Sequence, residues 1–250
     1  MQGHMDTKRF WNDRLSAHWD TEGVGYLALG RGFNHWMYVM RRIVFRRFVP
    51  CVRGARACDI GAGTGVYTAE LIKSGYQVTG IDISPRAVRG LARAFPQMYV
   101  VEGDVAEGLP GTYDLIVAMD VLFHIVDDAK YRAAIGHIAA ALPSGGRLIF
   151  SDNFPPERAA HKHQVSRSAS EITAVLSAAG LRIVERRPMF VLMNAPVKYW
   201  TGWWYVLERV LWRAPALGWG IGVLLLPFEY LLVTYLRQTP STEIVICERI

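Results

Sequence analysis

The chain of 250 residues is 51% hydrophobic and 20% charged, which is enough to bury one substantial core together with appendages. Its net charge of +6 does not indicate a nucleic-acid partner, because outside one helix the basic residues do not cluster with stacking aromatic residues. Cys51, Cys58 and Cys247 are odd in number and lack metal-ligand spacing, so we expect a reducing cytoplasm, no disulfide framework and no metal.

The N-terminal part of the chain is predicted to be helical. Residues 1–5 contain a second methionine and look like an expression scar, and no cleavable signal peptide is visible. Apolar residues then recur at helical spacing, for example Phe33, Met37 and Val44. We therefore expect residues 6–50 to form a helical cap.

Arginines lie on the other face of this predicted helix. Arg42 and Arg46 fall opposite the apolar residues. That face is either the solvated side of a packed helix or, with Arg41 and Arg47, a patch for anionic lipid headgroups.

A glycine-rich loop, Asp59–Gly65, follows the strand-like residues Arg56–Cys58 and precedes the helix-like residues Tyr67–Ile72. Three glycines at alternate positions remove the side chains from this turn. A flat polar cofactor can then lie against bare backbone near the positive end of the helix. A dinucleotide-binding loop has the spacing Gly-x-Gly-x-x-Gly, and here the third glycine comes one residue early.

Acidic residues repeatedly end the apolar strands that follow. Asp82 ends one strand and could accept hydrogen bonds from both hydroxyls of a ribose, and Asp104 ends the next and could meet an adenine amino group. Further strands are predicted at residues 113–120 and 145–152. Ligands bind at such strand ends in open α/β sheets, and the alternation of strands with helices predicts a parallel sheet.

As a set, these motifs over about residues 51–194 resemble those of class I S-adenosylmethionine (SAM) methyltransferases of the small-molecule type. The resemblance implies an α/β fold with a doubly wound, mostly parallel, seven-stranded sheet whose last strand is antiparallel. It implies SAM as cofactor and S-adenosylhomocysteine (SAH) as product. It also implies cofactor contacts from Asp59, Gly61, Ala62, Gly63, Asp82, Ile83, Asp104, Val105, Met119 and Tyr38.

The resemblance also suggests where an acceptor is bound. Caps of this class are often built from residues before the glycine loop, so Tyr26, Asn34 and Tyr38 are candidates for contacts with SAM or the acceptor. Arg167, in the loop after the fifth strand, could orient an anionic group. Trp200 is a further candidate acceptor contact.

Methyl transfer to a hydroxyl requires a base, and two histidines are candidates. His124 follows the fourth strand, and His163 lies between the fifth strand and the next helix. Either could instead be structural or solvated. Some quinone-pathway O-methyltransferases carry Glu-x-x-Glu-His at this point and bind a divalent cation. Here Asp120 and Phe123 occupy the two acidic positions, so no metal is predicted.

The segment of residues 195–240 is predicted to be a helical insertion before a final strand at 241–250. It carries five of the eight tryptophans, and residues 216–236 contain one charge, Glu229. Its length permits a membrane span, but the final strand must return to the sheet on the same side. Residues 199–236 therefore cover the pocket, form a homodimer surface or contact a membrane peripherally.

We predict a SAM-dependent methyltransferase that acts on an oxygen, less readily a nitrogen, of a small apolar or ring-containing molecule in the cytoplasm. A nucleic-acid acceptor is not expected, because Met119–His124 lacks the Asn/Asp-Pro-Pro-aromatic motif of amino-methylating DNA enzymes. One alternative is a membrane-associated enzyme, on the inner membrane face, that methylates a lipid-linked glycan or lipid precursor. Another is a catalytically idle SAM-binding scaffold.

Overall fold

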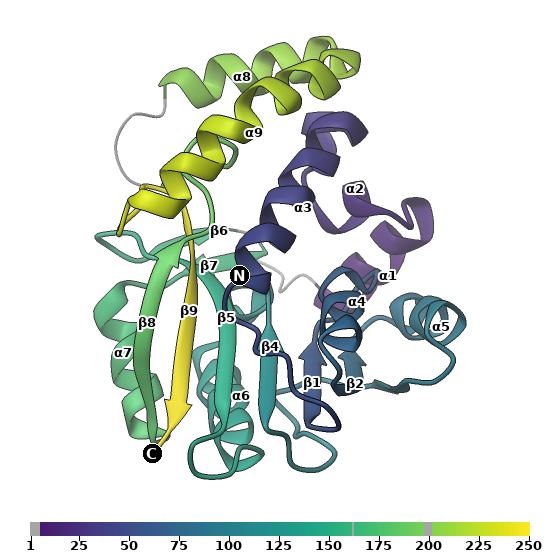
Figure 1. Cartoon of the computed structure of the whole chain (residues 1–250), viewed down its shortest axis with the longest axis vertical. Coiled ribbons are helices and arrows are strands. Elements are labelled where there is room, and N and C mark those ends of the chain that lie inside the picture. Colours follow the sequence, from purple (N-terminus) through teal and green to yellow (C-terminus); the bar gives the residue numbers. More distant parts are fainter. Residues whose placement is uncertain (1–5, 162, 198–201) are drawn as a thin grey trace.

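The computed structural model describes residues 6–161, 163–197 and 202–250. Residues 1–5 and Trp200 therefore lie outside the described residues. Within these ranges the chain forms a central sheet with helices on both faces, and a helical segment lies at one end (Figure 1).

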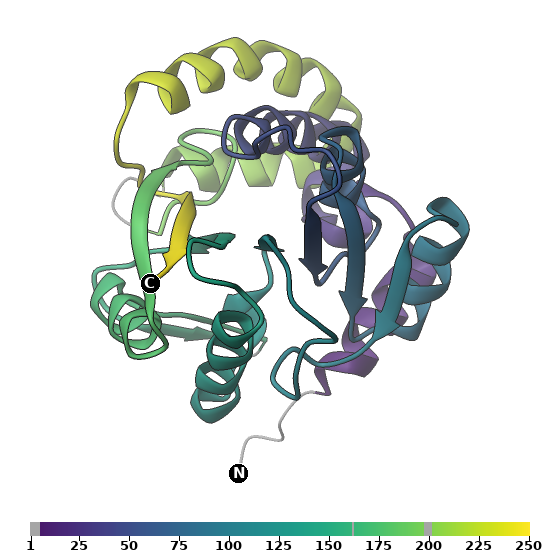
Figure 2. The same cartoon turned by 60° about the horizontal axis from the view of Figure 1, so that its bottom comes forward.

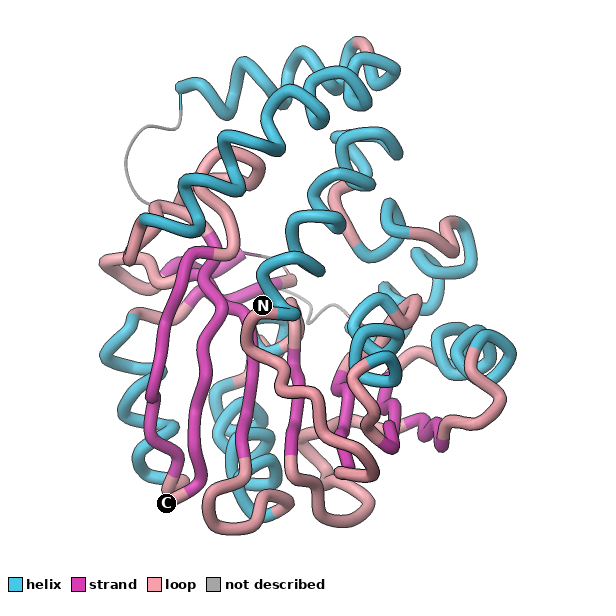
Figure 3. The backbone as a smooth tube through the Cα atoms, viewed as in Figure 1, coloured by secondary structure: helices cyan, strands magenta, loops and turns pink. Residues whose placement is uncertain are grey.

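The sheet has seven strands in the order β3-β2-β1-β4-β5-β9-β8 (Figures 1 and 3). The strands are β1 (Arg56–Ile60), β2 (Gln77–Asp82), β3 (Tyr99–Glu102), β4 (Leu115–Ala118), β5 (Arg147–Asn153), β8 (Leu181–Pro188) and β9 (Thr242–Arg249). The first five run parallel, and β9 runs antiparallel to both β5 and β8. The predicted fold class is confirmed, with the last strand inserted between its two predecessors.

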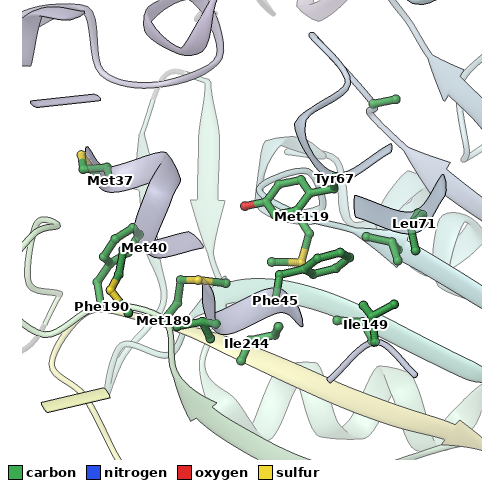
Figure 4. Close-up of a cluster of buried hydrophobic side chains, with 14 of the residues drawn as sticks. Met37, Met40, Phe45, Tyr67, Leu71, Met119, Ile149, Met189, Phe190 and Ile244 are labelled. Atoms are coloured by element: carbon green, nitrogen blue, oxygen red, sulfur yellow. The ribbon is translucent and has the colours of Figure 1, made fainter. Parts of the chain in front are cut away.

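Helices cover both faces of the sheet. One face carries α3 (Gly30–Arg46), α4 (Val66–Lys73) and α5 (Pro85–Ala94), and the other carries α6 (Asp128–Ala140) and α7 (Ala169–Ala178). Each face has its own apolar core. Figure 4 shows Met37, Met40 and Phe45 of α3 in one cluster with Ile149 and Ile244 of the sheet. Full burial of each such side chain stabilises the fold by about 1.5–3 kcal/mol.

The N-terminal residues form α1 (Thr7–Ala17), α2 (Thr21–Val24) and the 3-10 turn η1 (Leu27–Leu29), ahead of α3. Asn34 is buried, and its amide group exchanges hydrogen bonds with both the N–H and the carbonyl of Tyr26. It also donates to the carbonyl of Gly30. Asn34 therefore holds the turn that leads into α3, because its polar atoms are already used there.

After β8 the chain forms α8 (Gly202–Arg213), η3 (Pro215–Leu217) and α9 (Gly218–Tyr235). α9 packs closely along α3. A Cβ atom added to Gly222 would lie 2.5 Å from Cδ1 of Trp36, and one added to Gly32 would lie 2.6 Å from Cδ1 of Trp219. Small residues therefore set the distance between the two helices.

The single charge of α9, Glu229, faces inward. Its carboxylate is buried and accepts hydrogen bonds from the backbone N–H groups of Val191 (2.5 Å) and Leu192 (2.7 Å). Among the described helices, Pro215–Tyr235 is the one long and apolar enough to cross a bilayer by length and composition.

Two short strands, β6 (Ala159–His161) and β7 (Gln164–Ser166), pair as a hairpin after β5. This hairpin and η2 (Leu122–His124) follow neighbouring strands of the sheet, and β7 contacts η2. The two candidate histidines are therefore brought together from distant parts of the sequence.

Candidate active site

A cavity of about 680 Å³ opens at the carboxyl ends of β1, β2 and β4. Its walls come from the glycine loop, from the residues that end β2 and β3, and from the segment after β4. α1 contributes Lys8 and Trp11, and the core helices contribute Tyr38 and Tyr67. The cavity therefore lies where an open α/β sheet binds ligands.

The glycine loop needs glycine for two physical reasons. Gly61 and Gly65 have left-handed φ angles of 63° and 84°. A Cβ atom on Gly61 would lie 2.4 Å from Cγ2 of Val121, and one on Gly65 would lie 2.4 Å from Cε2 of Phe95. Gly61, Ala62 and Gly63 line the cavity, so the loop offers backbone to a ligand.

Asp59 supports the glycine loop from the side away from the cavity. It is buried, it accepts a 2.5 Å hydrogen bond from the Thr68 hydroxyl, and burial raises the pKa of its carboxyl to about 7. It is absent from the cavity walls formed by the described residues. The structure thus places Asp59 beneath the glycine loop, where it ties the end of β1 to α4.

Asp82, at the end of β2, lines the cavity together with Ile83. Its two carboxylate oxygens accept 2.8 Å hydrogen bonds from the N–H groups of Gly63 and Ser84. Burial raises its pKa to about 6, and the two N–H donors oppose that shift. The carboxylate retains lone pairs that could accept hydrogen bonds from a vicinal diol.

The residues after β3 form the outer wall of the cavity. Asp104 accepts a hydrogen bond from the N–H of Ala106 (2.9 Å) and one from Lys130 (3.3 Å), and Val105 lies beside it. Glu102 forms a 2.6 Å ion pair with Lys8 of α1. This ion pair holds α1 across this side of the cavity, and no sequence motif predicted it.

Arg41 is a buried cation that lies behind the cavity wall, where it contacts the wall residues Tyr38 and Asp120. Its guanidinium lies over the rings of Tyr38 (5.3 Å) and Phe190 (4.9 Å) and forms an ion pair with Asp120. Its Nε atom is buried without a hydrogen-bond partner among the described residues.

One of the sequence interpretations placed Arg41 in a patch for lipid headgroups, whereas in the structure Arg41 is buried. Arg41 is four residues after Met37, so it shares the buried face of α3, and this spacing is the signal that could have identified it.

Asp120 has φ of 59°, the only positive value for a non-glycine residue in the described ranges. Its N–H donates to the Ser151 hydroxyl (2.7 Å), which in turn donates to its carboxylate (2.9 Å). Left-handed backbone outside glycine costs about 1 kcal/mol or more and concentrates at functional sites. Ser151 on β5 therefore holds a strained turn that presents Asp120 to the cavity.

His124 lines the cavity, and its Nδ1 atom lies 2.9 Å from the backbone oxygen of His163. Burial lowers the pKa of His124 to about 4, so the ring is neutral at neutral pH. Its ring stacks with that of His163 at 5.9 Å and meets the edge of Trp11 at 5.1 Å. His163 is exposed, and its ring also stacks on Phe10 at 5.6 Å.

The candidate acceptor contacts lie in different surroundings. Arg167 is buried, donates to Asp128 (2.7 Å) and to the carbonyl of Ile125 (3.0 Å), and covers the ring of Tyr131. It therefore holds the segment after η2. Tyr26 is 42% exposed at the start of η1, outside the cavity walls formed by the described residues. Among those residues no three His, Cys, Asp or Glu side chains group as metal ligands.

Two curated relatives align with part of the chain. A ubiquinone biosynthesis O-methyltransferase of Xanthomonas euvesicatoria is 33% identical over 105 residues, and one of Xylella fastidiosa is 32% identical over 124 residues. The alignments cover 39% and 47% of this chain and 43% and 49% of the relatives. The chain thus spans about half the length of the curated relatives it matches.

Two solved structures share the fold over nearly the whole chain. Magnesium protoporphyrin IX methyltransferase of Synechocystis, with bound SAM, gives a TM-score of 0.59 at 18% identity and covers 100% of both chains. The N-methyltransferase NodS of Bradyrhizobium japonicum, in complex with SAH, gives 0.60 at 15% identity and covers 98% of both chains.

A family model described as a methyltransferase domain matches residues 33–186, which is more than half of the chain. This range contains the glycine loop and the ends of β2, β3 and β4 that form the cavity. The chain therefore belongs to the methyltransferase domain family, with the Rossmann-like fold of the class I SAM-dependent enzymes, which confirms the resemblance drawn from its glycine loop and strand-end acids.

Proposed function

We propose that the chain binds SAM in this cavity and transfers its methyl group to an oxygen of a small molecule. The observation that carries the proposal is the convergence of the glycine loop, Asp82 and Asp104 on one cavity. The names of the relatives, ubiquinone biosynthesis O-methyltransferases, support oxygen over nitrogen.

The residues present fit the proposed cofactor. The Asp82 carboxylate would accept hydrogen bonds from the ribose hydroxyls, and Asp104 with Val105 would contact the adenine. Ala62, Gly63 and Ile83 would supply the surrounding wall.

The inner end of the cavity fits the amino-acid portion of SAM. Arg41, whose Nε atom lacks a partner among the described residues, would meet the α-carboxylate. Met119 and Tyr38 would lie beside the methionine portion, since both line that end of the cavity.

When bound, SAM supplies an electrophilic methyl group on a sulfonium centre. The protein then has to align the acceptor and exclude water. Trp11 of α1 covers the cavity near His124, and the Lys8–Glu102 ion pair fastens α1 to the sheet. α1 would therefore act as the lid over the reacting groups.

His124 is the proposed base for the acceptor hydroxyl. Because a carbonyl oxygen only accepts, the contact with His163 requires the proton of His124 on Nδ1. Nε2 then keeps its lone pair and could take a proton from the acceptor. His163, the second candidate base, would act through its carbonyl by fixing this tautomer.

The acceptor is proposed to be apolar or to contain a ring. The apolar walls of the cavity and the aromatic residues of the helical segment support this class. Tyr26, Arg167 and Trp200 remain proposed acceptor contacts. A lipid-linked glycan, a lipid precursor or an idle SAM-binding scaffold are the alternatives to be separated by experiment.

The test compares Asp82→Asn with His124→Gln in an assay that follows labelled methyl groups from SAM into a panel of phenols and hydroxylated lipids. SAH binding is measured in parallel by calorimetry. We expect Asp82→Asn to weaken SAH binding, and His124→Gln to keep it while losing transfer. If none of the acceptors in the panel is methylated, the scaffold alternative is favoured. If the protein does not bind SAH, the proposal is refuted.

The small molecule is one partner, and residues 199–236 are proposed to contact another. The protein would work in the cytoplasm, or peripherally on the inner membrane face, and this segment would meet either a membrane or a second copy of the chain. The aromatic side chains of α8 and α9 support a contact role.

A further inference from the structure

The outward side of α8 and α9 is a broad apolar surface, which we call the hairpin face. It consists of the exposed apolar residues of the two helices, which lie together at one end of the molecule (Figures 1 and 2). On α9, Leu224, Phe228, Leu231 and Tyr235 recur every three or four residues, so they share one side of the helix. Its principal members are Trp212, Leu224, Phe228, Leu231 and Tyr235.

These side chains are unusually exposed for their size. Trp212 is 70% exposed, Leu224 is 69% exposed and Tyr235 is 79% exposed. The only charge within α9, Glu229, is buried and bonded to backbone N–H groups, so the outward half of α9 carries none. A contiguous apolar face of this kind marks an interaction site.

Arginines border the hairpin face. Arg209 and Arg213 lie on the exposed side of α8, and Arg237 follows α9. Arg47, directly after α3, donates to the Thr234 hydroxyl and lies over the ring of Tyr230, at the same end of α9. None of these four arginines forms an ion pair with any residue in the described ranges.

We infer that the hairpin face docks on an anionic phospholipid bilayer, with α9 lying in the headgroup region. Exposed tryptophan and tyrosine side chains suit that region, because it is apolar on one side and wet on the other. The bordering arginines would pair with lipid phosphates, because no acidic side chain in the described ranges forms an ion pair with them. This deepens the proposed function and rests on it, because it chooses between the membrane and the second copy of the chain proposed above and concerns where the enzyme works.

The structure favours a surface contact over a membrane span. The inner side of α9 packs on α3 through Gly222 and Trp36, and Glu229 holds the segment after β8. A span would break both contacts. A second copy of the chain is less complementary, since a symmetric partner presents the same arginines and no exposed acid on α9.

Vesicle flotation with the full chain tests the inference. Protein is mixed with vesicles of phosphatidylcholine alone or with added phosphatidylglycerol, at low and high salt. We expect the protein to float with the anionic vesicles and to bind less at high salt, because salt screens headgroup charges. Flotation only with neutral vesicles, or with neither kind, would overturn the inference.

Two variants and two matched controls separate the apolar from the cationic contribution. Leu224→Glu should abolish flotation, whereas Tyr99→Glu, at a 65% exposed position on β3, should not. Arg209→Glu/Arg213→Glu should abolish binding to anionic vesicles. Arg89→Glu/Arg93→Glu, with the same spacing and charge change on α5, should bind like the unchanged protein.

SAH binding and light scattering complete the design. SAH binding unchanged by Leu224→Glu shows that the variant is folded, and it reports on the proposed function separately from docking. A dimer that Leu224→Glu dissociates, together with flotation that this variant retains, would assign the hairpin face to a second copy of the chain.

Discussion

The Nδ1 atom of His124 lies 2.9 Å from the backbone oxygen of His163, 39 positions later in the chain. The contact joins η2, after β4, to the hairpin after β5, and the two rings stack above it. Because the acceptor atom is a carbonyl oxygen, it is present in any variant of the His163 side chain. The pair therefore supports the proposed base role of His124 and the proposed supporting role of His163.

His124→Gln is expected to lower kcat by about 10²–10⁴-fold, the usual contribution of a general base. His163→Ala should cost far less, because the carbonyl that bonds Nδ1 remains. Since burial holds the pKa of His124 near 4, its basic form persists at every pH above that value. Transfer measured from about pH 5 to 8 should show no inflection from this group. A step near pH 6.5 that His124→Gln removes would contradict the assignment.

SAM affinity is expected to depend on the ionisation of Asp82. Burial raises its pKa to about 6, so the carboxylate that accepts the ribose hydrogen bonds is lost as the pH falls through that value. Hydrogen bonds to charged groups contribute about 1.5–3 kcal/mol, so Asp82→Asn should weaken SAH binding by roughly ten- to a hundredfold. Calorimetric titration of SAH between about pH 5 and 8 measures the effect. Affinity that stays constant across pH 6 would contradict it.

The ligand-free protein is expected to lose stability as the pH rises from about 6.5 to above 8. Burial raises the pKa of Asp59 to about 7 and that of Asp152 to about 8, from 3.8 in each case. The folded state therefore holds protons that the unfolded state has released, and this advantage disappears as the pH passes the folded pKa values. His124 acts in the opposite sense only below about pH 6.5, because its pKa is lowered.

Urea unfolding at several pH values checks this slope, and Asp152→Asn provides the control. Asp152 is buried on β5, and its carboxylate accepts a hydrogen bond from the N–H of Asn153. The variant cannot ionise, so the part of the slope nearest pH 8 should vanish. A free energy of unfolding that rises over this range in the unchanged protein would show that other groups dominate.

The helix pair α3–α9 is expected to be sensitive to side-chain size at one position. Gly222→Ala places a Cβ atom 2.5 Å from Cδ1 of Trp36, so the helices must separate. Overpacking of this kind costs about 1–3 kcal/mol. Gly220→Ala, two residues earlier on the exposed side of α9, has no atom within 4 Å of the new Cβ and should stabilise by up to about 1 kcal/mol. Equal melting temperatures for the two variants would contradict the packing argument.

The sequence predicted the sheet, and most of its candidate cofactor contacts line one cavity, because the signals for both are local. Alternating short strands and helices, the glycine spacing, and acids such as Asp82 at strand ends can each be read within a few residues. The positions of β8 and β9 in the sheet depend on where the chain re-enters the sheet after the helical segment. That return depends on long-range packing, which no local pattern encodes.

Three features of the structure were missed in the sequence, two of them at or beside the site. Arg41 was grouped with its exposed neighbours, although its helical position placed it with the buried face. His163 contributes a backbone oxygen, and side-chain chemistry gives no hint of that. Glu229 looked like an isolated charge in an apolar run. Its carboxylate accepts hydrogen bonds from the backbone N–H groups of Val191 and Leu192, which lie nearly 40 positions earlier.

Arg41 offers the sharpest test of how the inner end of the cavity is used. If its guanidinium meets the α-carboxylate of SAM, Arg41→Gln should weaken SAH binding by roughly ten- to a hundredfold, as expected for a charged hydrogen bond. 5′-Methylthioadenosine keeps the adenine and the ribose but lacks the amino-acid portion, so its affinity should be almost unchanged. Calorimetry with both ligands separates this role from general damage. Asp120→Asn serves as the control for loss of the Arg41–Asp120 ion pair, because it removes the carboxylate charge while leaving the Arg41 guanidinium in place. An equal loss for both ligands in Arg41→Gln would mean that Arg41 shapes the pocket, and that another group receives the carboxylate.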